Sequence, residues 1–415
     1  MKILVLSQYF WPETFRIAVV VQSLRDLGHE VTVLTGQPNY PDGVVPPGYS
    51  AASLRTQTHD GLTIYRVPLL PRGRGSAPRL VLNYLSFIVS AAAFGPWLLR
   101  GRHFDVVLVY GVSPILQAIP AIWLAWVKGA KLVTWVQDLW PESLSATGFV
   151  RNPKLLGAVA AVVRWIYRKN DLLLVQSQAF VEPVVRMAGG KPVIYHPNPG
   201  ELAFSKPGTD SACPLQLEPG FNVVFAGNLG TVQALDTVLA AAQLLRDEPD
   251  VRFVLVGSGN RSEWMQQEIR RLGLDNVRLP GRFPPSDMPV ILAQASAVLV
   301  SLVRDPTMSQ TVPGKVQAYL AAGRPIIASL DGEGARVVME AGAGVTCPAQ
   351  DAQALADAVR QLRDALPGER QRMARCGRFY YEQHFEPNLL ARRLSQILSK
   401  MVSGKLAAET QTKNG

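Results

Sequence analysis

Residues 197–226, PNPGELAFSKPGTDSACPLQLEPGFNVVFA, separate the chain into two halves of similar pattern. Residues 197–220 collect Pro, Gly and Ser without periodicity, which is typical of a linker between domains. FNVVFA at 221–226 is then a short apolar run that ends at Gly227, as expected for a strand buried in a parallel sheet. We therefore predict one domain over residues 1–200 and a second over residues 206–386.

Both halves alternate short apolar runs with segments of helical pattern. Before the linker, strands are predicted at 2–7, 30–35, 105–110, 131–136 and 172–176, with a helix at 17–27. After it, strands at 221–226, 251–256, 276–279, 297–302 and 325–329 alternate with helices at 237–245, 262–271, 287–295 and 315–322. This predicts an α/β protein with two doubly wound, Rossmann-like domains, whose ligands bind beyond the carboxyl ends of the strands. A cleft between the domains is the expected active site.

The composition excludes several classes of protein. With 415 residues, 48% of them hydrophobic and 18% charged, the chain can bury sizeable cores and is not a disordered segment. Its three cysteines, Cys213, Cys347 and Cys376, lie far apart and form no CxxC pair, which argues against a disulfide framework and a zinc site. The apolar run at the N-terminus is too short for a signal peptide, so a cytoplasmic protein is expected.

The positive charge lies mainly in the first half. Residues 1–205 hold 19 Lys and Arg against 11 Asp and Glu, a net charge of +8, and the whole chain has +10. No RNA-binding or helix-turn-helix pattern accompanies this charge, so nucleic acid is not the expected partner. An anionic membrane surface or a phosphate-bearing substrate fits better.

Residues 80–99, LVLNYLSFIVSAAAFGPWLL, form an uncharged run between Arg79 and Arg100. Its length would allow it to span a bilayer. The run contains Asn83 and a Gly95–Pro96 pair, which favour a helix that lies on the membrane interface instead. A true membrane span and a buried core helix remain the alternatives.

Two glycine-containing turns follow predicted strands in the second half, at 227–230 and 257–259. Glycines there let the backbone approach a phosphate or a sugar closely, although tight turns without a ligand would have the same pattern. Lys315 lies in the first turn of a predicted helix, where a cation opposes the helix dipole, so a bound diphosphate is the preferred interpretation. Arg282 is a weaker basic candidate. The sequence VGSGNRS lacks the third glycine of a dinucleotide-binding fingerprint.

Asp138 follows the predicted strand at 131–136, at the position where open α/β sheets carry catalytic groups. It could orient a hydroxyl group or stabilise positive charge on a sugar ring; the alternative role is a helix N-cap. Glu13 and Arg16 lie in the first loop and are expected to face the same cleft. The chain has no DxD, HExxH or GxSxG motif, so metal-bridged diphosphate chemistry, zinc proteolysis and serine hydrolysis are not indicated.

Seven segments in order along nearly the whole chain resemble glycosyltransferase family 4, in particular the branch that builds bacterial O-antigen and colanic-acid-type polysaccharides and includes L-fucosamine transferases. The segments are YFWPE, LRDLGHEVTVLTGQPNYPDG, VQDLWPES, FAGNLGTVQALDTVLAAA, FVLVGSG, VPGKVQAYLAAGRPII and DGEGARVV. The resemblance implies a GT-B fold, with the nucleotide-sugar donor bound by the second domain and the acceptor by the first. It also implies retention at the anomeric carbon, no required metal or cofactor, and a last helix at about 388–401 that packs back on the first domain.

The resemblance also assigns roles to residues. Asp138 would lie near the reacting sugar, and the loop from Asn39 to Gly43, including Tyr40, near the acceptor. The wider family has an E-x7-E pair whose second member contacts the donor ribose; Gln310 and Ala318 stand there in this chain. We expect Gln310 to remain on the donor side and Glu333, in a glycine-flanked turn after a strand, to supply the missing acid. The donor diphosphate would be held by Gly227, Asn228, Gly230 and Lys315, and the nucleoside would be approached by Gly257 and Gly259.

Together these observations predict a peripheral enzyme at the cytoplasmic face of the bacterial inner membrane. It would transfer a sugar, most simply an N-acetylated deoxyhexosamine, from a UDP-sugar to a polyprenyl-diphosphate-linked saccharide. The first alternative is a UDP-sugar 2-epimerase of the same fold, although an epimerase has no need of the apolar run at 80–99. The second is a catalytically silent assembly partner, which the replacements at Gln310 and Ala318 would allow.

Overall fold

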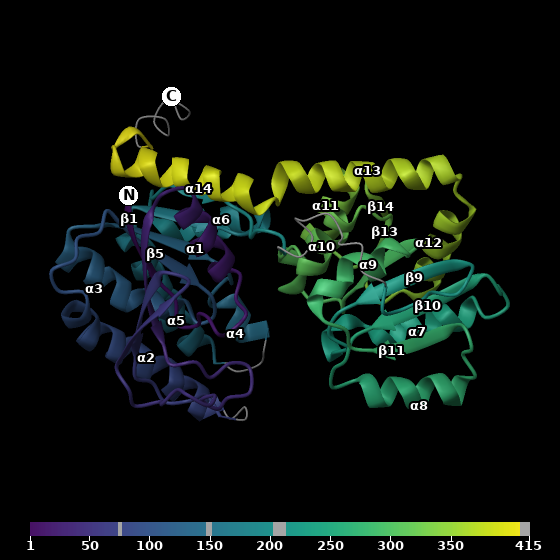
Figure 1. Ribbon diagram of the computed structural model, residues 1–415, viewed down its shortest axis with the longest axis horizontal. Helices are drawn as coiled ribbons and strands as arrows, with labels where there is room; N and C mark the ends of the chain where they lie inside the picture. Colours follow the sequence, from purple (N-terminus) through teal and green to yellow (C-terminus); the bar gives the residue numbers. More distant parts are fainter. Residues whose placement is uncertain (74–76, 147–151, 202–212, 407–415) are drawn as a thin grey trace. The chain divides into compact units, whose positions relative to one another are not determined.

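A computed structural model describes residues 1–73, 77–146, 152–201 and 213–406 (Figure 1). Contacts divide the chain into two compact units, Met1–Pro199 with Leu390–Gly415, and Gly200–Leu389. Each unit contains its own sheet and its own hydrophobic cores. The middle of the predicted linker, residues 202–212, lies outside the described residues.

The sheet of the first unit has eight strands in the order β3-β4-β2-β1-β5-β6-β7-β8. Strand β3 pairs antiparallel with β4, and the other neighbours pair in parallel. Strands β2 to β4 are added on one side of β1, and strands β5 to β8 are added on its other side. A topological switch point therefore lies between β1 and β5. The strands are β1 (Lys2–Leu6), β2 (Glu30–Gly36), β3 (Arg55–His59), β4 (Leu62–Val67), β5 (Val106–Gly111), β6 (Lys131–Val136), β7 (Leu172–Val175) and β8 (Val193–Tyr195).

Helices cover both faces of this sheet, as right-handed crossovers between parallel strands require. Helices α1 (Ile17–Asp26) and α14 (Pro387–Val402) pack on one face. The other face carries α2 (Ala77–Leu98), α3 (Ala118–Lys128), α5 (Pro153–Lys169) and α6 (Val181–Ala188), and the short α4 (Glu142–Ala146) follows β6. Helix α14 is the last helix expected at about 388–401, and its Leu394 and Leu398 are fully buried in the core with α1.

The second unit has a six-stranded parallel sheet in the order β11-β10-β9-β12-β13-β14. Its switch point lies between β9 and β12. The strands are β9 (Phe221–Ala226), β10 (Val251–Val256), β11 (Val277–Gly281), β12 (Ala297–Ser301), β13 (Ile326–Ser329) and β14 (Gly344–Cys347). One core includes α7 (Leu235–Leu244), α8 (Ser262–Leu272) and α12 (Ala352–Asp364); the other includes α9 (Met288–Ala293), α10 (Gly314–Ala322), α11 (Glu333–Glu340) and α13 (Pro367–His384).

The predicted fold class is confirmed, because both sheets are built mainly from parallel strands connected through helices. The strands and helices predicted from the sequence are all present, with ends that differ by at most two residues. The prediction lacked the strands β3, β4, β8 and β14, of which β3, β8 and β14 lie at sheet edges.

Most of the uncharged run 80–99 forms α2, which packs on the sheet along one narrow stripe. Its buried residues are Asn83, Phe87, Ala91 and Gly95, spaced four apart. Only 22% of its most apolar 18-residue window is buried. The alternative of a buried core helix is therefore wrong, because most of the apolar surface of α2 is exposed. Within the described ranges, α2 is also the one helix long and apolar enough to cross a membrane.

The buried polar residue of α2, Asn83, joins this helix to two loops. Its Oδ1 accepts a hydrogen bond from Gln8 Nε2 at 2.8 Å, and its Nδ2 donates to the carbonyl oxygen of Leu70 at 2.6 Å. Gln8 follows β1, and Leu70 follows β4. Asn83 therefore fixes the apolar helix to the loops beyond the carboxyl ends of two strands.

Replacing Asn83 by Leu is expected to lower the free energy of unfolding by about 2–4 kcal/mol, since two buried polar groups lose their partner. Urea unfolding of the purified full chain measures the effect. Ser90→Ala, on the same helix, is the control and should change the free energy of unfolding by less than about 0.5 kcal/mol. Equal effects of the two substitutions would show that the Asn83 network does not stabilise the fold.

Candidate functional site

A cavity of about 720 Å³ opens at the carboxyl ends of β9 and β10 in the second unit. Its lining comes from the turns after these strands, the segment after β11 and the first turns of α10. Cavities of this size and position bind small molecules and cofactors in open α/β sheets. Six of the eight residues predicted for the donor side line it: Gly227, Asn228, Gly257, Gly259, Arg282 and Lys315.

The glycines of this cavity are required by close packing between two turns. Gly257 has φ +142°, and a Cβ atom there would lie 1.8 Å from the carbonyl oxygen of Gly227. A Cβ atom on Gly259 would lie 2.4 Å from the carbonyl oxygen of Leu229. The turn after β10 thus rests directly on the turn after β9, and the amide of Gly227 donates to the carbonyl of Val256 at 2.9 Å. Only glycine allows this approach.

Lys315 is a half-buried cation in this lining. Its Nζ donates to Oε1 of Gln233 at 2.9 Å and lies 4.7 Å from the centre of the Phe225 ring. Burial lowers the pKa of Lys315 to about 8, although the charge of Glu201 acts in the opposite direction. A cation that is hydrogen-bonded to a neutral amide beside a helix N-terminus can be stabilised by a bound anion.

Three further residues around this cavity were not predicted from the sequence: Tyr319, Gln233 and Glu201. The hydroxyl of Tyr319 accepts a hydrogen bond from the amide of Ala226 at 2.8 Å. Tyr319 follows Lys315 by one helical turn and so shares its face of α10, a spacing that could have identified it. Glu201 lies in the linker, where the sequence has no periodic pattern.

The structure does not bring three other predicted residues into this lining. Gly230 lies next to Asn228, and Gln310 ends the short helical turn Met308–Gln310. Glu333 begins α11, and its two carboxylate oxygens accept hydrogen bonds from Arg336 at 2.9 and 3.1 Å. The carboxylate of Glu333 is thus engaged by an arginine of its own helix, and its contact with a donor stays a prediction.

In the first unit, Asp138 lies just beyond the end of β6. Its Oδ2 accepts a hydrogen bond from the amide of Ser113 at 3.0 Å, and Ser113 lies beyond the end of the neighbouring β5. Burial raises the pKa of Asp138, and the hydrogen bonds from Ser113 oppose this shift. The hydroxyl of Ser113 in turn accepts from Trp140 Nε1 at 3.0 Å. The carboxyl group is therefore held at the edge where the sequence pattern predicts a catalytic acid.

Glu13 has a different role from the one predicted, because backbone amides take up its carboxylate. Oε1 accepts from the amides of Asn39 and Tyr40, both at 2.8 Å, and Oε2 accepts from Phe10 at 3.1 Å. Burial raises the pKa of Glu13 and these three hydrogen bonds lower it in part. Glu13 therefore fixes the loop that begins at Asn39 against the loop after β1, and it is a positioning residue.

Tyr40 is exposed on that loop, and Arg72, from the segment after β4, lies beside it. The Tyr40 ring lies 5.1 Å from the Phe15 ring, centre to centre, and the Arg72 guanidinium lies 5.1 Å from the centre of the Tyr40 ring. Asn39 holds this pair together, because its Oδ1 accepts from the amide of Arg72 at 3.1 Å. Arg16 is directed elsewhere and donates to the carbonyl oxygen of Pro199. Exposed aromatic and guanidinium groups of this kind can bind a sugar face or a phosphate.

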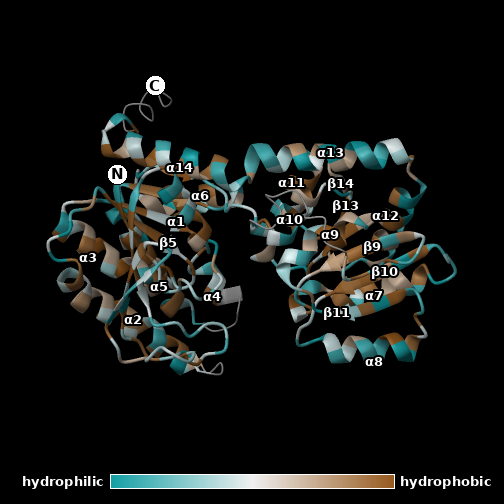
Figure 2. Ribbon diagram, in the orientation of Figure 1, coloured by the Kyte–Doolittle hydropathy of each residue, from teal (hydrophilic) through white to brown (hydrophobic). Residues whose placement is uncertain are grey.

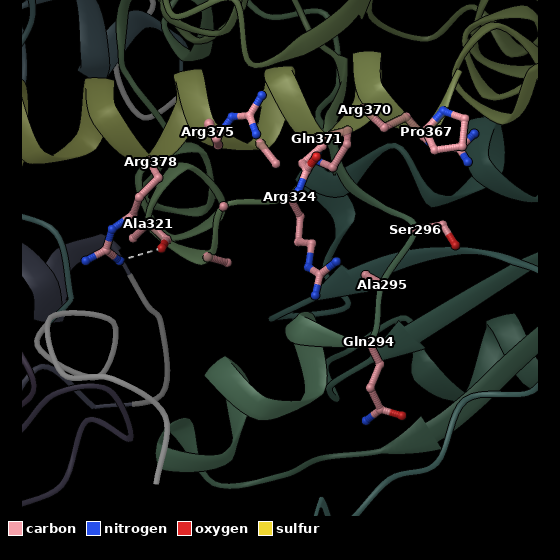
Figure 3. A pocket seen from close by; sticks show the side chains of 14 residues that line it. Gln294, Ala295, Ser296, Ala321, Arg324, Pro367, Arg370, Gln371, Arg375 and Arg378 are labelled. Carbon is pink, nitrogen blue, oxygen red and sulfur yellow. Dashed lines mark hydrogen bonds between the residues drawn. The ribbon is translucent and has the colours of Figure 1, made fainter. Parts of the chain in front are cut away.

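A second cavity in the unit Gly200–Leu389, of about 740 Å³, lies at the amino ends of β12 and β13 and beside α13 (Figure 3). Two of its arginines bind the carbonyl groups at helix ends: Arg378 donates to Ala321 at 2.7 Å, and Arg370 donates to Leu362, Arg363 and Ala365. Cations commonly stabilise helix C-termini in this way. Since ligands of open α/β sheets bind at the carboxyl ends, the cavity lined by Lys315 is the candidate site.

No three His, Cys, Asp or Glu side chains gather to hold a metal ion in residues 1–73, 77–146, 152–201 and 213–406. That the reaction requires no metal stays a prediction.

Comparison with known proteins gives matches over most of the chain. Residues 15–199 match the family model "Glycosyl transferase 4-like domain", and residues 220–364 match "Glycosyl transferases group 1". The putative colanic acid biosynthesis glycosyl transferase WcaI of Escherichia coli is 28% identical over 340 residues, which are 78% of this chain and 82% of that protein. The probable glycosyltransferase WbjE of Pseudomonas aeruginosa is 27% identical over 312 residues, 70% of this chain and 74% of that protein.

Two solved structures have the same fold over almost their whole length. Anabaena HepE in complex with UDP has a TM-score of 0.68 at 16% identity and covers 96% of this chain and 100% of its own. Sucrose-phosphate synthase from Thermosynechococcus elongatus has a TM-score of 0.72 at 16% identity, with 97% and 99% covered.

Proposed function

This chain belongs to the GT-B glycosyltransferases of family 4, in the branch that builds bacterial polysaccharides, and from that premise we propose that its donor is a UDP-sugar. The observation that carries the proposal is the half-buried Lys315 at the start of α10, in a cavity bounded by two glycine turns. A diphosphate bound in this cavity would place a strong anion beside the Lys315 amine. The fold shared with HepE, which was solved with UDP, supports the choice of nucleotide.

In the proposed reaction, the bond between the anomeric carbon and the diphosphate oxygen breaks, and its electron pair leaves with UDP. An acceptor hydroxyl forms the new bond to the anomeric carbon and passes its proton to the departing diphosphate oxygen, with retention of configuration. Negative charge grows on the diphosphate, where Lys315 and the backbone amides at the start of α10 stabilise it without a metal. Asp138 stabilises the positive charge that develops on the sugar ring.

The proposed acceptor is a polyprenyl-diphosphate-linked saccharide, and the proposed sugar is an N-acetylated deoxyhexosamine such as L-fucosamine. The enzyme would then work as a peripheral protein on the cytoplasmic face of the bacterial inner membrane, in O-antigen or exopolysaccharide synthesis. The net charge of +8 in residues 1–205 and the exposed apolar surface of α2 support contact with a membrane. The comparisons do not favour the epimerase alternative, because the two relatives from Escherichia coli and Pseudomonas aeruginosa described above are named as glycosyl transferases.

Incubation of the purified protein with a panel of UDP-sugars and a lipid-diphosphate disaccharide tests the proposed function. A mass increase of the acceptor by one sugar residue is the expected result. No product with any UDP-sugar would contradict the proposal.

The affinity for UDP is expected to fall as the pH rises through the pKa of Lys315, which is about 8 in the free protein. Diphosphate binds the protonated amine, so the dissociation constant should be nearly constant below this value and increase above it. Between pH 7 and pH 9 the expected weakening is roughly tenfold. Isothermal titration calorimetry at both pH values measures it.

Lys315→Arg is the matched control for this pH dependence, because an arginine stays protonated over the same range. Its affinity for UDP should change little between the two pH values. A wild-type dissociation constant that does not change with pH would show that the Lys315 amine does not contact the diphosphate.

A further inference from the structure

The first unit exposes large apolar side chains on two adjacent helices, α2 and α3. On α2 the exposed large apolar side chains are Val81, Leu82, Leu85, Val89, Phe94 and Trp97. Helix α3 packs beside α2 on the same face of the sheet. Figure 2 shows hydrophobic residues along both helices. Many large apolar side chains that are exposed on neighbouring helices of a folded unit indicate an interaction site.

Helix α3 contributes two exposed tryptophans to this surface. Trp126 is 74% exposed and Trp123 is 45% exposed, and their rings stack with centres 5.2 Å apart. Trp97 of α2 is also exposed, and the guanidinium of Arg100 lies 4.9 Å from the centre of its ring. Tryptophan and arginine in this combination are typical of the interface between water and lipid.

The stretch of sequence that contains the two helices is mainly basic. Neither α2 nor α3 contains an Asp or a Glu. Residues 61–137, which include both helices, hold eight Lys and Arg and a single acidic residue, Asp105. An anionic lipid surface complements this positive charge. Acidic side chains in this region would instead repel such a lipid surface.

The packing of α2 indicates that this helix does not cross the bilayer. With 22 residues it is about 33 Å long, which is enough to span the hydrocarbon region. However, its buried stripe from Asn83 to Gly95 lies against the sheet along most of this length. Crossing would separate Asn83 from Gln8 and from the Leu70 carbonyl and place polar groups in hydrocarbon.

We propose that the exposed sides of α2 and α3, the α2–α3 face, dock together on an anionic bilayer as a monotopic surface. Both helices lie on the membrane with their tryptophans among the lipid headgroups, and neither spans it. The inference deepens the proposed function, because it names the surface that would bring the enzyme to a lipid-linked acceptor. The inference also gives α3 a role in membrane binding, whereas the apolar run 80–99 points to α2 alone.

Flotation of the purified full chain with phospholipid vesicles tests the α2–α3 face. The protein should float with vesicles that contain phosphatidylglycerol and less with pure phosphatidylcholine. Trp126→Glu should reduce the partition coefficient roughly tenfold or more, because a large apolar ring is replaced by an anion. Phe379→Glu is the matched control, since Phe379 is 65% exposed on α13 of the second unit, and it should float like the wild type.

Two further measurements distinguish a defect of the α2–α3 face from misfolding and from loss of the donor site. Both variants should keep the wild-type melting temperature and UDP affinity, so loss of flotation with intact UDP binding isolates the membrane surface. UDP binding that fails while flotation persists would count against the proposed function alone. Release from cell membranes by an alkaline carbonate wash is expected of a protein that is held at the membrane surface and does not span the bilayer.

Any of three results would overturn the inference: a wild type that does not float with anionic vesicles, a Phe379→Glu control that loses as much binding as Trp126→Glu, or a protein that carbonate leaves in the membrane. Sedimentation that reveals a dimer, dissociated by Trp126→Glu, would also overturn it and assign the same surface to a second copy of the chain.

Discussion

Replacing Gly257 by Ala is expected to abolish measurable binding of UDP, a loss in affinity of roughly a hundredfold or more. The Cβ atom of the alanine would lie 1.8 Å from the carbonyl oxygen of Gly227, and the φ of +142° at this position is unfavourable for any residue with a side chain. The turn after β10 must therefore move away from the turn after β9. Both turns line the cavity of Lys315, so a small displacement changes its shape directly.

Gly273→Ala is the matched control for Gly257→Ala. Gly273 also has a positive φ, +62°, but a Cβ atom there meets nothing within 4 Å. Gly273 is the C-cap residue of α8 and has a left-handed backbone conformation. Alanine there should cost about 1 kcal/mol of stability and leave UDP binding unchanged. Calorimetric titration with UDP and thermal unfolding of both variants separate the two effects. If Gly257→Ala bound UDP like the wild type, the two turns would not shape the binding site.

The strands around both switch points could be predicted from sequence because each is buried on both faces. KILVL of β1 and FNVVFA of β9 are nearly continuous apolar runs, and helices cover both sides of each. The turns that follow these strands contain glycine or polar residues and mark the carboxyl edge. Fold class and the neighbourhood of Lys315 therefore follow from local pattern alone.

The hairpin of β3 and β4 escaped prediction because it lies at the edge of its sheet. RTQTH in β3 is polar and mostly exposed, so it has no apolar run that would indicate a strand. Its turn, Asp60-Gly61, has positive φ at both residues and is the two-residue connection that joins antiparallel strands. The Asp60-Gly61 pair could have indicated this hairpin, whereas the hydrophobicity of β3 could not.

Roles that depend on which partner a side chain meets were beyond the sequence. Glu13 was expected to face a substrate, but it accepts hydrogen bonds from the amides of Asn39 and Tyr40, which lie more than 25 residues away along the chain. Glu333 lies in a turn that suggested a ligand, but Arg336, one helical turn later, takes its carboxylate. Only the folded backbone determines whether a carboxylate meets an amide, an arginine or solvent.

Asp138→Asn is expected to reduce kcat by about 10²–10⁴-fold and to leave the affinity for UDP unchanged. An asparagine keeps the size of the side chain, and its oxygen can still accept the hydrogen bond from the Ser113 amide, so the fold should persist. It removes the negative charge that would stabilise a positively charged sugar ring. UDP affinity should be unaffected because the cavity of Lys315 belongs to the second unit.

The pH dependence gives a second measure of Asp138. Burial raises the pKa of Asp138. As the pH is lowered, wild-type turnover should therefore begin to fall at a higher pH than the one at which an exposed aspartate becomes protonated. The Asn variant should lack this decrease. Asp171→Asn is the control, because Asp171 also accepts a backbone amide, that of Leu132 at 2.8 Å, but lies at the amino ends of the strands. If Asp171→Asn lost as much turnover as Asp138→Asn, damage to the sheet would account for both, and Asp138 would have no part in the chemistry.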